Sequence, residues 1–154
     1  MLDRITPLIL TWNEEPNLAR TLEGVRWARR IVVIDSHSTD ATPDIARACA
    51  NVHLEQRRFD DFASQWNFGL DRVETPWVLA LDADYVLGEA FVAELRGLVP
   101  ADVTSGYRAR FRYCVEGRPL RASLYPPAVV LFRRALARFH QDGHTQRVAL
   151  AHGE

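Results

Sequence analysis

Short apolar runs alternate with amphipathic stretches over the first hundred residues. Residues 5–11, 31–34, 52–54 and 77–81 read as strands. The run at 31–34 is continuously apolar, which is typical of a strand buried on both faces. Apolar residues recur with helical spacing over residues 14–29, 42–50, 62–73 and 88–98. Asn13 and Thr42 are expected as the caps of the first two of these helices. Alternation of this kind predicts a mainly parallel sheet with helices on both faces, an α/β fold.

The pattern changes after Pro100. Residues 107–115 alternate loosely, Glu116-Gly117 is a turn signal, and residues 128–132 are again apolar. These features predict antiparallel strands added to the edge of the sheet. Because no linker separates the two parts, we expect a single domain over residues 1–154, with an antiparallel C-terminal extension over about residues 100–154.

Composition adds little to this picture. The chain has 154 residues, 47% of them hydrophobic and 25% charged, as in an ordinary soluble domain. It holds no apolar run near the ~20 residues of a spanning helix, no signal-peptide layout at its start, and only two cysteines. We therefore expect a cytoplasmic protein. Peripheral contact with the inner face of the membrane is compatible with this expectation.

Charge is distributed unevenly. Residues 1–104 carry a balance of -7, residues 105–154 carry +6, and all 19 basic residues are arginine. Genome base composition alone can produce an all-arginine set. The basic second half is suited to phosphates or to an anionic membrane surface. We expect no nucleic-acid partner.

Three polar, acid-bearing clusters follow predicted strands, at residues 11–15, 35–40 and 82–84. Ligands of an open parallel sheet bind outside the carboxyl ends of its strands, so these clusters should converge on one edge. The glycine-rich loops that hold phosphate in dinucleotide-binding and P-loop proteins are absent from the sequence. A phosphorylated ligand here would need a divalent cation held by carboxylates.

Asp82 and Asp84 suit that role, because residues two apart on an extended chain point the same way. Mg²⁺ and Mn²⁺ prefer oxygen ligands and bridge diphosphate oxygens. Taken alone, Asp-x-Asp is more often a solvated loop. Asp35 can accept hydrogen bonds from a base or ribose, or else cap the 38–40 turn. Trp12 can stack on a base or lie in the core.

Other polar residues are assigned by their position. Asp40 reads as a turn or cap residue and His37 as an exposed loop residue. Phe62, Trp66 and Leu70 share the core side of a helix, and Asn67, one position past Trp66, should point toward the ligand edge.

These clusters, in this order, resemble glycosyltransferase family 2. The similar features are Asn13-Glu14 after the first strand, the segment 35–42 (Asp-Ser-His-Ser-Thr-Asp-Ala-Thr), and Asp82-Ala83-Asp84 after a strand. Asn67, within Gln-Trp-Asn-Phe-Gly-Leu, fits the branch that acts on bacterial lipopolysaccharide core and related envelope glycans. The match covers roughly residues 5–90.

The resemblance implies the GT-A nucleotide-sugar-binding fold, with the nucleotide-binding part at about residues 5–90 and the acceptor side at about 100–154. It implies a base and ribose pocket lined by Trp12, Asn13 and Glu14, beside Thr11 at the strand end, with Asp35 on the base. Asp82 is expected on the ribose or the metal, and Asp84 on the metal and diphosphate. The family generally transfers sugar with inversion, in one displacement.

The sequence also departs from the family pattern. His37 and Ala41 replace glycines of the second motif, which bears on the shape of its turn, and Tyr85 follows Asp84 where the similar branch often has Glu. The His-Glu pair that often supplies the base is represented only by residues 142–146, with no acid directly after His144. Asp142 and His144 are the candidates for the base. The alternative is that Asp142 is only a loop residue and that His144 has only a structural role. The chain ends at Glu154, where similar proteins continue, so it reads as a shortened member, a fragment or part of an assembly.

The leading hypothesis is a metal-dependent glycosyltransferase that moves sugar from a nucleotide-sugar donor to a glycan or lipid-linked acceptor of the bacterial envelope. A catalytically degenerate nucleotide- or glycan-binding member is the second hypothesis, favoured by the missing acid after His144. A sugar nucleotidyltransferase is the third, and the lack of a glycine-rich basic loop after the first strand argues against it.

Overall fold

The structure is a computed structural model that describes residues 1–115, 118–121, 125–143 and 145–151. A six-stranded sheet with the order β3-β2-β1-β4-β8-β5 forms its centre. The parallel strands are β1 (Ile5–Thr11), β2 (Ile31–Asp35), β3 (Val52–Gln56) and β4 (Trp77–Asp82). The helices are α1 (Leu18–Gly24), α2 (Thr42–Arg47), α3 (Phe62–Leu70) and α4 (Glu89–Gly97), with short 3₁₀ turns η1 (Leu2–Arg4) and η2 (Arg134–Leu136).

The strand order places a topological switch point beside β1. The chain runs from β1 outward through β2 to β3, then crosses back to place β4 on the other side of β1. In the register, Thr11 lies opposite Asp35 of β2, and Leu10 lies opposite Asp82 of β4. The carboxyl ends of three strands therefore meet at one edge, where a doubly wound sheet binds its ligands.

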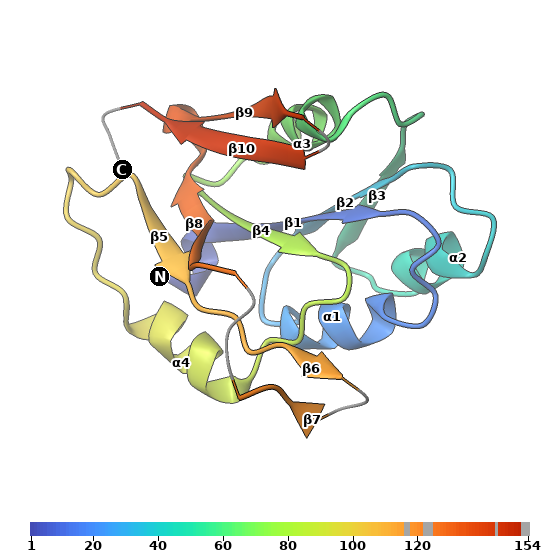
Figure 1. Ribbon diagram of the computed structural model, residues 1–154, viewed down its shortest axis with the longest axis horizontal. Coiled ribbons are helices and arrows are strands. Elements are labelled where there is room, and N and C mark those ends of the chain that lie inside the picture. Colours follow the sequence, from blue (N-terminus) through green and yellow to red (C-terminus); the bar gives the residue numbers. More distant parts are fainter. Residues whose placement is uncertain (116–117, 122–124, 144, 152–154) are drawn as a thin grey trace.

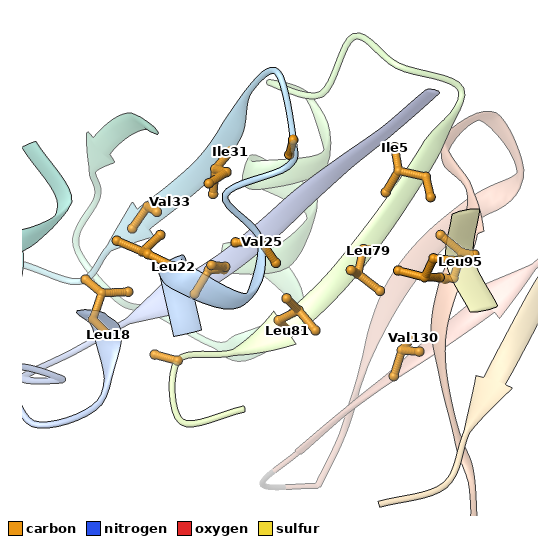
Figure 2. Packing of buried hydrophobic residues seen from close by; sticks show 14 of the residues in the cluster. Ile5, Leu18, Leu22, Val25, Ile31, Val33, Leu79, Leu81, Leu95 and Val130 are labelled. Atoms are coloured by element: carbon orange, nitrogen blue, oxygen red, sulfur yellow. The ribbon is translucent and has the colours of Figure 1, made fainter. Parts of the chain in front are cut away.

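Side chains alternate between the two faces of the central strands and form two hydrophobic clusters. One cluster joins Ile5, Ile9, Val33 and Leu79 of the sheet to α1, α2 and α4 (Figure 2). The other joins Leu8, Val32, Ile34 and Val78 to α3 and to a C-terminal hairpin. Both faces of the sheet are covered, which explains why its strands read as continuous apolar runs.

Two helix starts differ from the sequence expectation. Asn13 does not cap α1; a turn over residues 14–17 intervenes and the helix begins at Leu18. Thr42 does not cap α2, because its hydroxyl instead accepts a hydrogen bond from the backbone N–H of Glu14 at 2.7 Å. The cap of α3 is Asp61, whose carboxylate accepts from the N–H of Ser64 at 2.8 Å.

The C-terminal part extends the fold in two ways. As expected, β8 (Ala128–Arg133) and β5 (Gly106–Ala109) continue the sheet as antiparallel strands. In contrast, β9 (Ala137–Asp142) and β10 (Thr145–Leu150) form a separate hairpin that packs on α3. The strands β6 (Cys114–Val115) and β7 (Arg118–Pro119) form a small ribbon at the lower edge of Figure 1. The turn expected at Glu116-Gly117 lies outside the described residues.

No helix in the described part of the chain combines the length and apolar character that a bilayer span requires.

Candidate functional site

A pocket of about 880 Å³ opens at the carboxyl edge of β1 and β4. It brings together five of the residues expected from the sequence: Thr11, Trp12, Glu14, Asp82 and Asp84. The remaining lining residues are Leu10, Ser36, Arg58, Phe59, Phe62, Gln65, Trp66, Ala83 and Gln146. The pocket therefore lies where the strand order predicts a ligand.

Asp35 lies beneath this pocket and is fully buried. Its carboxylate accepts hydrogen bonds from the hydroxyl of Thr11 (2.9 Å) and from Nε2 of Gln56 (3.0 Å). Both the N–H and the hydroxyl of Ser38 also donate to it, at 2.9 and 2.5 Å. Four donors satisfy a buried carboxylate, so Asp35 ties the ends of β1, β2 and β3 together and also serves the turn at Ser38.

Two residues in the loops after β1 and β2 adopt left-handed backbone conformations. Asn13 has φ 54° and His37 has φ 58°. His37 stands where the family pattern has glycine, and it keeps the left-handed conformation that glycine favours. Asn13 is exposed and binds the neighbouring loop: its N–H donates to the hydroxyl of Ser38 at 2.8 Å, and its Oδ1 accepts from Thr39 N–H at 2.8 Å. Asn13 thus shapes the pocket edge from outside the lining.

Acidic side chains join the same two loops a little further along. Asp40 accepts hydrogen bonds from the N–H groups of Glu15 (3.1 Å) and Thr42 (3.0 Å). Glu15 in turn accepts from the N–H of Ala41 at 3.2 Å. Asp40 is therefore the turn residue that its position predicted. Glu14 alone of this group faces the pocket, and its carboxylate accepts from Asn17 at 3.0 Å.

Asp82 ends β4 and Asp84 lies in the turn that follows. Ala83 between them is buried, while both aspartates are exposed and line the pocket. The hydroxyl of Thr21 on α1, itself buried, binds the carbonyl oxygens of Ala83 (2.5 Å) and Tyr85 (2.9 Å). This contact fixes the turn so that the two carboxylates point to the same side.

The Asp82 side chain is exposed to solvent on the side of the pocket, and protein surrounds its carboxyl group on the other sides. This burial raises the pKa of Asp82 above its usual value, and the nearby charges of Asp84 and Glu14 raise it further, against a hydrogen bond from Tyr85 that lowers it. The same surroundings raise the pKa of the Tyr85 hydroxyl, first through burial and then through Asp82. Tyr85 is therefore the neutral donor in this pair.

The oxygen donors of the pocket fit a hard divalent cation. Mg²⁺ and Mn²⁺ are usually held by one or two carboxylates, with the other positions filled by water and substrate phosphates. Asp82 and Asp84 supply such a pair, and their mutual repulsion is relieved by a cation. Among the residues that the structure describes, no group of three His, Cys, Asp or Glu side chains is arranged as a complete metal site.

Aromatic side chains form the rim of the pocket. Trp12 is 66% exposed on one loop, so it is available for stacking and does not lie in the core. Phe59 and Phe62 are 43% and 42% exposed, and their rings meet edge to face at 5.0 Å. The expectation that Phe62 lies in the core is therefore wrong, whereas Trp66 and Leu70 are buried as expected. Phe62 occupies the first turn of α3, which projects beyond the sheet.

Arg58 is exposed and is the cation among the described lining residues, which also include the acids Glu14, Asp82 and Asp84. Its neighbour Arg57 instead supports the wall: it donates to both oxygens of Asp60 (2.8 and 2.7 Å) and to Oε1 of Gln65 (2.5 Å). This contact lowers the pKa of Asp60 to about 2. Sequence reasoning missed Arg58, Phe59, Gln65 and Gln146; the Arg-Arg-Phe run directly after the third strand was a signal for the first two.

Asn67 lies away from the pocket lining and holds the C-terminal hairpin. Its Nδ2 donates to the carbonyl of Phe139 at 2.9 Å, and its Oδ1 accepts from the N–H of Phe139 at 3.0 Å. Beside it, the ring of Trp66 stacks on that of Phe139, with centroids 5.2 Å apart. Asn67 was expected at the ligand edge, and its amide instead attaches β9 through both its oxygen and its nitrogen.

One of the two candidates for the base, Asp142, belongs to this hairpin. Asp142 ends β9, is exposed, and forms an ion pair with Arg147 (3.1 Å); it does not line the pocket. His144 lies outside the described residues. Gln146 of β10 does reach the pocket. Gln141 ties the hairpin end to α3, because its Oε1 accepts from the N–H of Ala63 (3.3 Å) and its Nε2 donates to the carbonyl of Gly143 (2.9 Å).

Comparison with known proteins places the whole arrangement in a family. The model of the family described as "Glycosyl transferase family 2" matches residues 8–144, from within β1 to beyond the end of β9. The chain belongs to glycosyl transferase family 2. The matched range contains both the Asp82-Ala83-Asp84 turn and the Asp35 loop.

Two curated relatives of this chain are named as glycosyltransferases. The lipopolysaccharide core biosynthesis glycosyltransferase LpsC of Rhizobium meliloti is 29% identical over 100 residues, which are 62% of this chain and 36% of LpsC. An uncharacterized glycosyltransferase of Rickettsia typhi is 28% identical over 95 residues, or 61% of this chain and 32% of that protein. This family 2 chain spans about a third of the length of these relatives.

Solved structures show the same fold. Glucosyl-3-phosphoglycerate synthase from Mycobacterium tuberculosis, in complex with UDP, superposes with a TM-score of 0.65 at 14% identity, covering 87% of this chain and 58% of that one. TarS of S. aureus, in complex with UDP-GlcNAc, gives 0.57 at 19% identity, covering 86% and 46%. The family 2 chain therefore has the GT-A fold that its sequence implied.

Proposed function

We propose that this chain is the donor-binding part of an inverting glycosyltransferase that uses a nucleotide-sugar and a divalent cation. The observation that carries the proposal is the pocket itself. Asp82 and Asp84 line one cavity together with Thr11, Trp12 and Glu14, at the switch point of the sheet. This is where a nucleotide-binding doubly wound fold receives its ligand.

In this proposal the nucleoside lies at the ends of β1 and β2. Trp12 stacks on the base or ribose, with Thr11, Asn13, Glu14 and Asp35 as the polar surroundings. Asp35 is buried and fully hydrogen-bonded, so it acts mainly by holding Thr11 and Ser38 in position. Both similar solved proteins are described in complex with UDP, which makes a uridine nucleotide the first ligand to test. Asn67 serves the donor site indirectly, through the hairpin.

The cation, Mg²⁺ or Mn²⁺, would be held by Asp82 and Asp84 and would neutralise the diphosphate of the donor. A solved structure of the mycobacterial synthase is described as a complex with Mn²⁺, UDP and glucosyl-3-phosphoglycerate. In this chain, Thr21 keeps the two carboxylates on the pocket side through its bonds to Ala83 and Tyr85. Arg58 adds positive charge on the opposite side of the same cavity.

The reaction follows from the placement of donor and hairpin. An acceptor hydroxyl attacks the anomeric carbon as the bond to the diphosphate oxygen breaks, so the nucleoside diphosphate leaves with the electron pair. The hydroxyl proton passes to a base, for which the hairpin offers Asp142 and His144. Asp142 ends the strand whose partner β10 brings Gln146 into the pocket. A single displacement of this kind inverts the anomeric centre.

The acceptor we propose is a glycan or lipid-linked glycan of the bacterial envelope. The support is the similarity to LpsC of Rhizobium meliloti, whose name places it in lipopolysaccharide core biosynthesis. The exposed aromatic pair Phe59 and Phe62 at the pocket rim gives a sugar ring an apolar face to pack against.

Calorimetric titration tests the donor site. The chain is titrated with UDP, GDP and dTDP, each with Mn²⁺ and with EDTA, and the series is repeated on Asp84→Ala. The matched control is Asp102→Ala, which removes an exposed acid outside the pocket lining. We expect Mn²⁺-dependent binding of one nucleotide by the wild type and the control, and its loss in Asp84→Ala.

The opposite results are equally clear. Nucleotide binding that is unchanged in EDTA, or retained in Asp84→Ala, removes the cation from the proposal. Absence of binding by folded wild-type chain removes the donor site for these three nucleotides.

A catalytically degenerate binding member is the second candidate, and one observation favours it. The described acids that line the pocket are Glu14, Asp82 and Asp84, so Asp142 lies outside the lining. Mn²⁺-dependent binding of a nucleotide-sugar, without release of nucleoside diphosphate on incubation with envelope glycans, would support this reading. Release that depends on acceptor supports the transferase.

A further inference from the structure

Basic charge gathers in one segment that the donor site does not use. Residues 103–141 contain eight arginines and a single acid, Glu116. Five of these arginines fall between residues 108 and 121, and all five are exposed. Arg108 belongs to β5. The other four flank or belong to β6 and β7, the small ribbon at the lower edge of Figure 1, on the opposite side of the sheet from the β9–β10 hairpin.

Four of these arginines keep their charge available. Among the described residues, Arg110, Arg112, Arg118 and Arg121 form no ion pair, whereas Arg26 and Arg47 elsewhere pair with Glu23 and Asp44. An arginine with no acidic partner leaves a net positive field at the surface.

Apolar side chains are exposed beside these arginines. Val115 is 59% exposed, Leu120 is 38% exposed and Tyr125 is 67% exposed. The pairing of Val115 with Arg118, and the bond from Leu120 N–H to the carbonyl of Tyr113 at 2.8 Å, hold the two chains of the ribbon side by side. We name Arg110, Arg112, Arg118, Arg121, Val115, Leu120 and Tyr125 together the arginine-rich surface.

A row of aromatic rings connects this surface to the pocket. The ring of Tyr85 lies 4.9 Å from Phe111, Phe111 lies 6.3 Å from Tyr113, and Tyr113 lies 5.8 Å from Tyr125, between centroids. Tyr85 is the residue that donates to Asp82. The arginine-rich surface is therefore packed onto the turn that carries the two pocket aspartates.

We propose that the arginine-rich surface docks on an anionic phospholipid bilayer. A membrane-surface element combines basic side chains, which attract anionic headgroups, with apolar and aromatic side chains that enter the interface. This surface has both kinds, and the aromatic row sets it at a fixed position relative to Asp82 and Asp84. The proposal concerns attachment alone and stands whether or not the pocket transfers sugar.

Vesicle co-sedimentation tests the proposal on the whole chain. Vesicles of phosphatidylcholine alone are compared with vesicles that also contain phosphatidylglycerol. The test variant is Arg110→Gln/Arg112→Gln/Arg118→Gln. The control is Arg26→Gln/Arg29→Gln/Arg47→Gln, which makes the same change in net charge at exposed positions elsewhere.

We expect the wild type and the control to bind phosphatidylglycerol vesicles and not neutral ones. Each arginine near an anionic surface strengthens binding about fivefold, so the test variant should bind on the order of a hundredfold more weakly. Raising the salt from about 0.1 M to 1 M should also release the wild type, because the Debye length falls from about 10 to about 3 Å. This measurement needs no variant.

Three results would overturn the proposal. They are equal binding to neutral and anionic vesicles, equal loss in test and control variants, and no binding by the wild type. Release of the chain from vesicles by inorganic phosphate at constant ionic strength would also overturn it, since that identifies a site for single phosphate groups.

Discussion

Asn67 pairs with Phe139 as a neighbouring β-strand would. Its side-chain amide donates to the Phe139 carbonyl at 2.9 Å and accepts from the Phe139 N–H at 3.0 Å. One side chain on α3 thereby satisfies both backbone groups of a residue in β9, 72 positions later in the sequence. The position of the hairpin against α3, and with it the approach of Gln146 to the pocket, depends on this contact.

Replacing Asn67 with Ala should loosen the hairpin. The variant leaves two backbone groups of Phe139 without partners, which costs about 1–3 kcal/mol in the free energy of unfolding. We expect urea denaturation to show this loss, and hydrogen exchange to show faster amide exchange in β9 and β10 with little change in β1 and β2. Faster exchange spread evenly over the whole sheet would contradict the local role.

Replacing Gly69 with Val should disrupt the packing of α3 on the sheet. A Cβ at this position would stand 2.5 Å from Cδ1 of Leu8 and 3.2 Å from Cγ1 of Ile34, and both side chains are fully buried. Overpacking of this kind costs about 1–3 kcal/mol or more. Gly97→Val is the matched control, because nothing lies within 4 Å of a Cβ there. Thermal unfolding should separate the two variants, and equal losses would refute the close approach.

Replacing Asp82 with Asn should stabilise the fold near neutral pH. The pKa of Asp82 is raised above its usual 3.8 by burial and by Asp84 and Glu14, so ionisation disfavours the folded state as the pH rises through the raised pKa. We expect a modestly higher melting temperature at pH 7. The difference should shrink as the pH falls through the raised pKa and vanish below 3.8, where Asp82 is protonated in both the folded and the unfolded state.

The same Asp82 variant should lose affinity for Mn²⁺ and nucleotide, which identifies the destabilising charge as a functional one. Asp102→Asn, at an exposed position outside the pocket, is the control and should change neither quantity. A lower melting temperature of Asp82→Asn at pH 7 would show that the carboxylate stabilises the fold.

Replacing Arg58 with Gln should weaken nucleoside diphosphate binding. Arg58 lines the same pocket as Glu14, Asp82 and Asp84, and it is the cation among the described lining residues. Loss of a charge-assisted hydrogen bond should raise Kd about tenfold at low salt, and less as salt screens the interaction. Arg96→Gln, on the exposed side of α4, removes the same charge elsewhere. Calorimetry that gives both variants the same Kd would exclude Arg58 from the site.

The parallel half of the fold follows from the sequence because its strands are buried on both faces. In a run such as 31–34 every side chain is apolar, so the strand is recognised from the sequence, and β2 is found at Ile31–Asp35. The clusters after the strands predicted the pocket for the same reason: the carboxyl ends of parallel strands meet at one edge. Asp82 and Asp84 lie where that argument places them.

The rest depends on contacts that are distant in sequence. Thr42 and Asn13 look like helix caps, yet each binds the neighbouring loop instead, through Glu14 and Ser38. Local capping rules cannot register a partner 25 or more residues away. Asn67 was misplaced for the same reason, since its partner Phe139 belongs to a hairpin whose short, mixed strands carry a weak pattern.

The pocket has two walls of different construction. Loops after β1 and β2 are cross-linked around Asp35, Asn13 and Asp40, so a change in one of these residues disturbs several strands at once. The opposite wall is a hairpin attached to α3 mainly through Asn67, Gln141 and the stacked rings of Trp66 and Phe139. Evolution can therefore vary the outward residues of the hairpin without disturbing the sheet. The chemistry of one wall can stay fixed within a lineage while the preferences of the other diverge.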